Sequence, residues 1–285
     1  HRTIFDAAGT ETLPGTRVRS EGEAAGSDAA VTEAYQGLGS THELYRVAYQ
    51  RASIDNHNLP LNATVHYGKD YDNAFWNGDQ MVFGDGDGTI FQSFTSSLSV
   101  IGHELTHGVT QYTAALDYEG QSGALNESIS DVFGALVDQY ANHQNAAQAS
   151  WLIGAGLFTA EVQGKALRSL KAPGTAYDDD VLGKDPQPAT MSGYVKTTDD
   201  NGGVHLNSGI PNHAFYLVAA ALGGYAWERA GQLWYDTLAS GTLPTDCDFV
   251  RFATETTDAA SARYGANSEE RSAVAAAWQQ VGVSP

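Results

Sequence analysis

Cysteine is almost absent from the sequence, because Cys247 is the only one among 285 residues. A single thiol cannot form a disulfide within the chain and offers no thiolate cage for a metal ion. We expect Cys247 to be a small, half-buried side chain that takes no part in chemistry.

Basic residues and long apolar runs are also scarce. The chain has 15 Lys and Arg against 34 Asp and Glu, which gives a formal net charge of −19. Nucleic acids and anionic membranes require a basic face, so we expect neither as a partner. No run of about 18 apolar residues occurs, and we expect no membrane-spanning segment. With 42% apolar residues the chain can still bury a large core, and its length allows one or two domains.

The most informative segment is residues 97–112, SLSVIGHELTHGVTQY. As a helix, this segment brings His103 and His107 one turn apart on one face, so that two imidazoles can bind one ion. Neutral imidazole is a good zinc ligand, and catalytic zinc sites have three protein ligands with a fourth position open to water. Glu104 lies beside anything bound to the metal, where a general base for a zinc-bound water is expected.

The third ligand is expected on a second helix. Residues 123–140, GALNESISDVFGALVDQY, have an apolar helical pattern and carry Glu127, with Asp131 one turn later. If the two helices pack antiparallel, Glu127 can complete a His, His, Glu set. Asp131 or Asn126 can then accept a hydrogen bond from the second ring nitrogen of a ligating histidine.

Each motif is weak alone, and only their combination is strong. An HExxH match arises by chance, and one Glu and one Asp on a helix usually belong to a solvated face. A metzincin is excluded, because it requires Gly and His three and six residues after the second histidine, where this chain has Thr110 and Thr113.

The spacing and context of these motifs resemble the thermolysin family of metallopeptidases. Nineteen residues lie between His107 and Glu127, and the likeness extends over NAFWNGDQMVFGDGDG, HELTHGVTQYTAALDY, NESISDVFG, ALRSL and DNGGVHLNSGIPN. It covers nearly the whole chain and is weakest before Tyr49 and in residues 142–149 and 173–191. The short N-terminal region with LPGTRVRSEG is more similar to the protealysin-type branch than to thermolysin itself.

The resemblance implies an α+β fold with two subdomains. Residues 1–122 are expected to form a mixed, β-rich subdomain that ends in the HELTH helix, and residues 123–285 a mainly helical subdomain. The zinc site would lie in the cleft between them.

Local patterns give the elements in more detail. In the first half we expect a hairpin within residues 1–26, a helix from Ser27 to about residue 52 that can bend at Gly37 and Gly39, and strands at 64–67 and 74–84, the second folded back at Asn77-Gly78. In the second half we expect a short helix at 151–159 and a surface loop at 173–196 with a solvated acidic run at 178–180. Four amphipathic helices should follow, at 208–222, 226–239, 246–263 and 268–281.

Residues 84–88, GDGDG, are not expected to bind calcium as an EF-hand loop. Such a loop requires Gly at its sixth position and Glu at its twelfth, where this chain has Ile90 and Ser96. We expect a turn that supports the active-site wall.

Several residues acquire roles only through the resemblance. It implies that main-chain groups of Ala74 and Trp76 pair with an extended substrate and that the amide of Asn73 holds the substrate main chain. It also implies that the guanidinium of Arg168 points at the substrate carbonyl and at nearby carboxylates. Without the resemblance, Asn73 would be a turn residue, Trp76 a core residue and Arg168 a structural ion-pair partner.

The resemblance also assigns the donors for the oxyanion and the specificity pocket. It implies that Tyr118 and His205 stabilise the oxyanion, with Asp200 orienting His205. Alone, Tyr118 would be a core or surface residue and His205 a capping residue. The pocket for the residue after the scissile bond would be lined by six apolar side chains: Phe91, Phe94, Val100, Ile153, Leu157 and Leu167.

The predicted activity is that of a zinc-dependent neutral endopeptidase that cuts on the N-terminal side of bulky hydrophobic residues. Glu104 would take a proton from the zinc-bound water as it attacks, then transfer it to the leaving nitrogen. A zinc aminopeptidase would have one residue fewer between the second histidine and the glutamate, and a GAMEN-like segment that is absent here. Intact Glu104, Tyr118 and His205 argue against a non-enzymatic binding protein on the same scaffold.

The double calcium site of thermolysin is predicted to be absent. A hard cation needs six to eight oxygen ligands, and Asp138 is left without acidic neighbours. The matching positions hold other residue types: Ser99, Ser150, Leu152, Ala155 and Lys165.

The expected partners are peptide and protein substrates, together with the chain's own propeptide or a protein inhibitor, and we expect a monomer. The sequence begins at His1 with neither an initiator methionine nor a signal peptide, which fits a processed mature form. The resemblance implies a removed propeptide and secretion.

Overall fold

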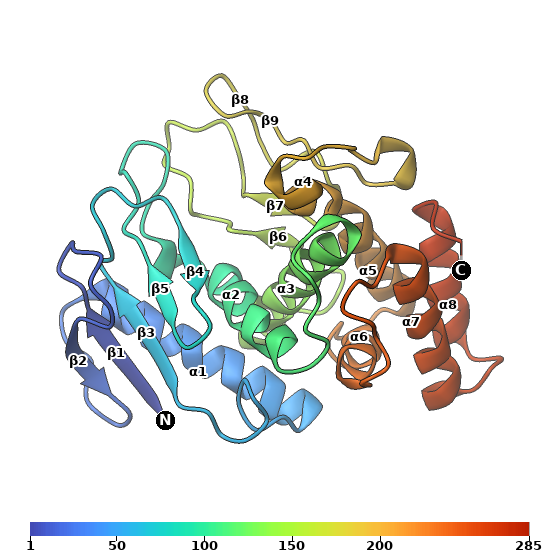
Figure 1. Cartoon of the computed structure of the whole chain (residues 1–285), viewed down its shortest axis with the longest axis horizontal. Coiled ribbons are helices and arrows are strands. Elements are labelled where there is room, and N and C mark those ends of the chain that lie inside the picture. The colour runs from blue at the N-terminus through green and yellow to red at the C-terminus, as the bar shows by residue number, and fades with distance from the viewer. Residues whose placement is uncertain (285) are drawn as a thin grey trace.

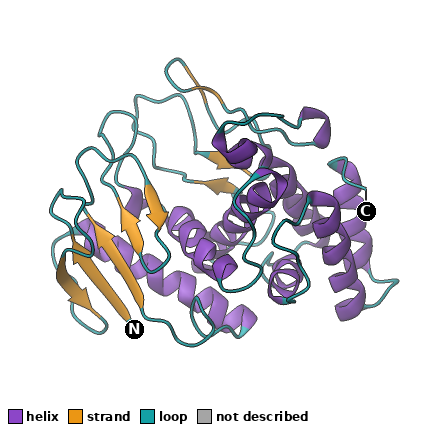
Figure 2. Cartoon of the chain, viewed as in Figure 1, coloured by secondary structure: helices purple, strands orange, loops and turns teal. Residues whose placement is uncertain are grey.

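The N-terminal part of the chain forms a mixed five-stranded sheet, at the left of Figure 1 and in orange in Figure 2. The computed structural model describes residues 1–284. The strand order is β2-β1-β3-β5-β4, with β1–β3 and β3–β5 parallel and the other pairs antiparallel, so that β4 is an edge strand. The strands are β1 (Arg2–Asp6), β2 (Thr16–Ser20), β3 (Leu61–Val65), β4 (Ala74–Trp76) and β5 (Met81–Phe83).

The two predicted hairpins are confirmed, and the strand expected at residues 64–67 lies earlier in the chain. β3 starts at Leu61 because it pairs in parallel with the whole of β1. It ends at Val65 because the next residue, His66, has a φ of 55°, which is incompatible with extended backbone.

Helix α1 (Ala29–Tyr49) packs against β1 and β3, and its N-cap lies one residue after the start expected at Ser27. Its N-cap is Asp28, not Ser27, because the Asp28 carboxylate accepts a hydrogen bond from the N–H of Val31 at 3.2 Å. The helix continues through Gly37 and Gly39, the two positions where a bend was expected. At Gly37 a Cβ would lie 2.3 Å from Cδ1 of Ile101, so this glycine permits the close approach of the next helix.

Helices α2 (Leu98–Gln111) and α3 (Gly120–Ala141) lie side by side in the middle of the molecule (Figure 1). The short connection between them makes them antiparallel neighbours. Their backbones approach at a glycine pair, where a Cβ on Gly102 would lie 3.1 Å from Cα of Gly134. A Cβ on Gly134 would lie 2.4 Å from the carbonyl oxygen of Ser99. The pair therefore sets the separation of the two helices that carry the candidate ligands.

The C-terminal part consists mainly of helices, and the α+β class is as predicted. The four helices expected after residue 208 are confirmed, although α6 starts at Ala230 because residues 226–229 form a turn. Their apolar faces meet around a buried aromatic cluster: Phe215, Trp234, Phe252 and Trp278. The helices are α4 (Asp200–Asn207), α5 (Gly209–Leu222), α6 (Ala230–Ala239), α7 (Phe249–Tyr264) and α8 (Glu269–Gln280).

The prediction of a helix at residues 151–159 is wrong. Strand β6 (Leu152–Ile153) pairs with β7 (Arg168–Ser169) in an antiparallel ladder. Trp151, Gly154 and Gly156 have φ angles of 59°, 77° and 84°, which a right-handed helix does not allow. The two glycines make this conformation accessible and bring Ser99 Oγ within 3.0 Å of the N–H of Gly154.

The segment at residues 173–196 is less exposed than predicted. It contains the hairpin of β8 (Asp178–Asp179) and β9 (Gly183–Lys184) and a 3-10 turn at Met191–Gly193. In the acidic run Asp178 and Asp180 are exposed, but Asp179 is buried. Its carboxylate accepts hydrogen bonds from three backbone N–H groups, those of Gln163, Val181 and Leu182.

The turn predicted at residues 84–88 lies slightly later, at residues 87–91. Oδ1 of Asp87 accepts hydrogen bonds from the N–H groups of Thr89, Ile90 and Phe91. The N–H of Gly84, directly after β5, donates to the carbonyl oxygen of Asn73 at 2.9 Å and so extends the pairing of β5 with β4.

Cys247 is fully buried rather than half-buried, with 1% of its surface exposed. Burial raises the pKa of its thiol to about 12, which leaves it neutral and unreactive at neutral pH. Among the helices of residues 1–284, none is long and apolar enough to cross a membrane.

We predict that Gly134→Ala lowers the free energy of unfolding by about 1–3 kcal/mol, because the new methyl group overlaps the backbone of α2. Gly39→Ala is the matched control within α1, since the nearest atom to its Cβ is the flexible end of the Arg2 side chain. Urea unfolding of both variants measures the difference. Equal stability of the two variants would contradict this account of the helix contact.

Candidate active site

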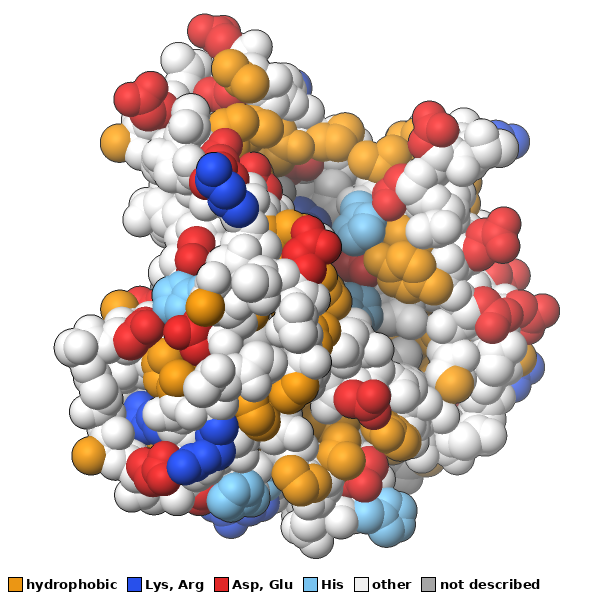
Figure 3. All heavy atoms as spheres, turned by 60° about the vertical axis from the view of Figure 1, so that its left-hand side comes forward, with side chains coloured by type: hydrophobic (Ala, Val, Ile, Leu, Met, Phe, Trp, Pro, Cys, Tyr) orange, Lys and Arg blue, Asp and Glu red, His pale blue; other side chains and the backbone are white. Residues whose placement is uncertain are grey.

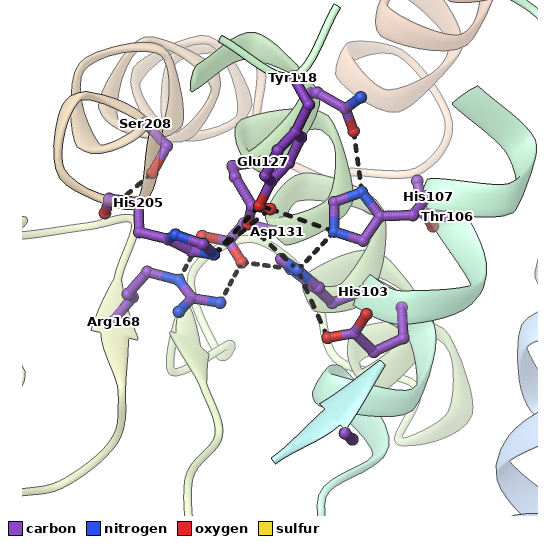
Figure 4. A network of polar contacts seen from close by, with 12 residues as sticks. His103, Thr106, His107, Tyr118, Glu127, Asp131, Arg168, His205 and Ser208 are labelled. Carbon is purple, nitrogen blue, oxygen red and sulfur yellow. Dashed lines mark hydrogen bonds and ion pairs between the residues drawn. The ribbon is translucent and has the colours of Figure 1, made fainter. Parts of the chain in front are cut away.

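Three side chains from α2 and α3 converge on one point (Figure 4). Nε2 of His103 and Nε2 of His107 are 3.1 Å apart, as expected for residues one helical turn apart. Oε2 of Glu127 lies 3.3 Å from Nε2 of His103, and Oε1 lies 3.3 Å from Nε2 of His107. One ligand atom from each residue lies within 4.8 Å of the others.

Two hydrogen bonds fix the direction of both imidazoles. Nδ1 of His103 donates to Oδ1 of Asp131 at 2.7 Å, and Nδ1 of His107 donates to Oδ1 of Asn126 at 2.8 Å. Asn126 is itself held, because its Nδ2 donates to the carbonyl oxygen of Leu116 at 3.1 Å. Both Nε2 atoms are therefore left free as ligands with their lone pairs toward the same point.

The donor set and its surroundings fit a zinc ion. Glu127 is 1% exposed, and its Oε2 is buried without a hydrogen-bond partner, which is costly for a carboxylate oxygen unless a cation pairs with it. Two imidazole nitrogens and one carboxylate oxygen form a common ligand set of catalytic zinc. Within residues 1–284 this is the one group of three or more His, Cys, Asp or Glu whose ligand atoms lie so close together.

Asp131 joins four elements around the site. Its carboxylate accepts hydrogen bonds from His103 on α2, from Nε and Nη2 of Arg168 on β7 at 2.7 and 2.8 Å, and from Nδ2 of Asn212 on α5 at 2.8 Å. Burial alone would raise the pKa of Asp131, but the charge of Arg168 and the hydrogen bonds of His103 and Arg168 outweigh it and lower the pKa. Asp131 is therefore a buried anion.

Glu104 lies beside the three ligands. Its Oε1 is 3.9 Å from Nε2 of His103, and it lines both cavities of the cleft. Burial raises the pKa of Glu104 despite the nearby charges of His103 and His107. A carboxylate with a raised pKa is a stronger base, which suits proton transfer.

Tyr118 lies beside Glu127 between His107 and His205, with its ring centroid 6.2 Å from that of His107 and 6.3 Å from that of His205 (Figure 4). The Tyr118 hydroxyl donates to Oε1 of Glu127 and lies 3.3 Å from Nε2 of His205. Asp200 binds His205 twice, through the backbone N–H at 2.8 Å and through Nδ1 at 2.6 Å. This double contact depends on a left-handed turn, in which residues 200–203 all have positive φ and the glycines at 202 and 203 adopt it without strain.

The cleft contains two cavities that meet at Glu104, and Figure 3 shows the hollow with histidine and acidic side chains at its base. The smaller, of about 180 Å³, is lined by Asn73, Ala74, Phe94, Val100, His103, Glu104, Leu167, Arg168 and His205. The larger, of about 550 Å³, extends along β4 and includes Phe75, Trp76, Gln111 and Tyr118.

The structure separates the six expected pocket residues into two groups. Phe94, Val100 and Leu167 line the smaller cavity. Ile153 and Leu157 are fully buried beneath it, and Phe91 packs beside Phe94 with ring centroids 5.4 Å apart. The first three side chains contact the cavity, and the other three support its wall.

Sequence reasoning missed two polar residues of the site. Asn212 completes the hydrogen bonding of Asp131, and Gln111 accepts a hydrogen bond from Nε1 of Trp76 at 2.9 Å. Asn212 is 0% exposed on the apolar helix α5, so a polar residue among apolar ones was the available signal. Gln111 offered none, because it lies on the exposed end of α2.

Comparison with known families agrees with this geometry. Residues 2–111 match the family described as thermolysin metallopeptidase, catalytic domain, and residues 114–283 match thermolysin metallopeptidase, alpha-helical domain. The chain belongs to the thermolysin family. The predicted family is therefore confirmed, and the site is that of a thermolysin-family zinc metalloendopeptidase with His103, His107 and Glu127 as the zinc-binding cluster.

Several members of the thermolysin family are similar to the chain over almost its whole length. An "Extracellular metalloprotease" of Pectobacterium carotovorum subsp. carotovorum is 56% identical over 283 residues, which cover 99% of this chain and 81% of the relative. A "Thermolysin" of Alicyclobacillus acidocaldarius subsp. acidocaldarius is 39% identical over 289 residues, which cover 98% and 50%. The solved precursor of protealysin, a metalloproteinase from Serratia proteamaculans, has a TM-score of 0.97 at 58% identity and covers 99% of this chain and 87% of its own.

Proposed function

We propose that this thermolysin-family peptidase cleaves peptide bonds on the N-terminal side of bulky hydrophobic residues, with Glu104 as the group that transfers protons. The observation that carries the proposal is the position of Glu104 next to the converging ligands, 3.9 Å from Nε2 of His103. A zinc ion held by His103, His107 and Glu127 would polarise the substrate carbonyl and would make a bound water molecule more acidic.

Glu104 takes the proton of the attacking water and delivers it to the leaving nitrogen. Its position at the meeting point of the two cavities supports this role, because a peptide that spans both cavities has its scissile bond next to Glu104. No side chain has to form a covalent bond with the substrate.

Tyr118 donates a hydrogen bond through its hydroxyl, and His205 through Nε2–H in its imidazolium form, to the oxyanion that forms during attack. Their polar atoms lie 3.3 Å apart on the same side of Glu127, so one oxygen atom can contact both. Asp200 accepts a hydrogen bond from Nδ1–H of His205 and so keeps Nε2 directed into the cleft.

The substrate backbone adds as a strand to the free edge of β4. The main-chain groups of Ala74 and Trp76 at this edge support such pairing. Oδ1 of Asn73 accepts a hydrogen bond from the N–H of Ala74 at 2.9 Å, which leaves its Nδ2 for a substrate carbonyl. Arg168 lines the smaller cavity, where its guanidinium can contact the carbonyl of the residue after the cut.

We further propose that the protein acts outside the cell after removal of a propeptide. The names of its relatives, an extracellular metalloprotease and a protealysin precursor, support this part of the proposal. Full-length protein retained inside cells of the source organism, with no processed form in the medium, would contradict it.

Glu104→Gln should lower kcat by about a thousandfold, because it removes the proton acceptor but keeps the shape of the side chain. The substrate is an internally quenched, N-blocked peptide with Leu after the cleavage site. Zinc content should stay at one ion per chain, zinc chelation should abolish wild-type cleavage, and zinc return should restore it. Glu43→Gln, an exposed change on α1, is the control. Normal turnover by Glu104→Gln would refute the role of Glu104, and cleavage only of peptides with a free N-terminus would indicate an aminopeptidase.

Peptide mapping of digests should find cuts mainly before Leu and Phe, because the cavity next to Glu104 is lined by Phe94, Val100 and Leu167. Leu167→Ala should raise the preference for Phe over Leu by about tenfold, since the removed atoms enlarge the cavity. Leu217→Ala, at a half-buried leucine on α5, should leave the preference unchanged. Cuts before charged residues would contradict the assignment of this pocket.

Removal of calcium at constant zinc should leave the melting temperature unchanged, because the acidic ligands of the thermolysin double calcium site are replaced. Ser99 stands at one of these positions and supports the proposal, because its Oγ accepts a hydrogen bond from the N–H of Gly154 at 3.0 Å. Asp138 accepts a hydrogen bond from Nδ2 of Asn142 at 3.2 Å. Scanning calorimetry with a calcium-selective chelator tests this, and a clear fall in melting temperature would contradict it.

A further inference from the structure

The backbone of His205 is held from outside its own helix by Gln187. Gln187 is only 5% exposed, and its Nε2 donates to the carbonyl oxygen of His205 at 2.7 Å and to Oγ of Ser208 at 2.9 Å. Ser208 Oγ lies 3.3 Å from the same carbonyl, a contact drawn in Figure 4. A buried amide from residues 173–196 therefore contacts the residue that points into the cleft.

Gln187 is itself rigidly anchored. Asp185 is 4% exposed and its carboxylate accepts hydrogen bonds from the N–H groups of Gly174, Ala176 and Gln187, at 3.0, 3.1 and 3.1 Å. The segment also fits closely against the start of α5, where a Cβ on Gly209 would lie 2.5 Å from the carbonyl oxygen of the proline that follows Gln187. The Gln187 side chain is therefore held in place by its packing and by the hydrogen bonds of the surrounding backbone.

The orientation of His205 depends on hydrogen bonds more than on packing. Its side chain is 49% exposed, so packing contributes little to its direction. It lies in the short helix α4, directly after the left-handed turn at residues 200–203. Asp200 holds the N–H and Nδ1, and Gln187 holds the carbonyl oxygen, so the two residues restrain the peptide groups on both sides of the His205 Cα.

We propose that Gln187 is a positioning residue that sets the orientation of His205 toward the substrate oxyanion. The inference rests on the oxyanion role of His205 in the proposed function. Displacement of a catalytic group by about 1 Å can cost about 100-fold in rate, so a residue that fixes the backbone of His205 affects turnover without touching the substrate.

Gln187→Met should lower kcat by about tenfold and change KM less than twofold, because its near-isosteric side chain keeps the packing and removes the donor. Gln187→Glu, which brings an acceptor against the carbonyl of His205, should lower kcat further. Gln139→Met is the matched control, because Gln139 on α3 is 2% exposed and both its amide atoms lack a hydrogen-bond partner. Its kcat should equal that of the wild type. Zinc content and melting temperature of each variant establish that the protein is folded and loaded.

A double-mutant cycle with His205→Ala decides whether Gln187 acts through His205. Gln187→Met should cause no further loss of kcat in the His205→Ala background, and it should weaken calorimetric binding of a phosphonamidate peptide about tenfold only when His205 is present. Equal losses in both backgrounds, or no loss in either, would overturn the inference while leaving the proposed function intact. Full activity of His205→Ala itself would instead refute the proposed role of His205, and the inference with it.

Discussion

The buried carboxylate of Asp131 is the group on which the arrangement of the site depends. A buried anion is tolerated only when its oxygens are paired, and here the partners come from α2, β7 and α5 while Asp131 itself belongs to α3. Removal of Arg168 would leave this charge without a cationic partner, and removal of His103 or Asn212 would leave one carboxylate oxygen with one hydrogen bond fewer. Because the Asp131 carboxylate must stay paired, it fixes the orientation of His103 and the direction of Arg168. Through Asn212 it also holds α5 close to α2 and α3.

The chemistry of the site follows from this restraint and from the short separation of α2 and α3. The glycine pair at 102 and 134 lets the helices approach closely enough for Glu127 to reach both histidines, and the Nδ1 hydrogen bonds leave only the Nε2 atoms for a metal. The edge strand β4 lies on one side of this centre, and the segments with Arg168 and His205 lie on the other. An extended peptide in the cleft therefore meets polar groups from both halves of the chain.

Features with a local physical cause could be predicted from the sequence. The metal ligands follow from the helical period, the C-terminal helices from their apolar stripes, and the hairpin of β4 and β5 from Asn77-Gly78. Features that depend on contacts distant in sequence could not. Residues 151–159 have helix-compatible apolar residues, but pairing with Arg168–Ser169 and two left-handed glycines determine their conformation. Asp179 and Gln187 look like solvent-exposed polar residues until the backbone groups that they bind are known.

The central claim is that His103, His107 and Glu127 hold one zinc ion with an open position beside Glu104. X-ray absorption at the zinc edge, on protein purified without added metal, measures the number and type of ligands directly. We predict one zinc per chain, with a first shell of nitrogen and oxygen atoms at about 2.0–2.2 Å that includes two imidazoles. A sulfur shell at about 2.3 Å, or an active enzyme without bound zinc, would contradict the account.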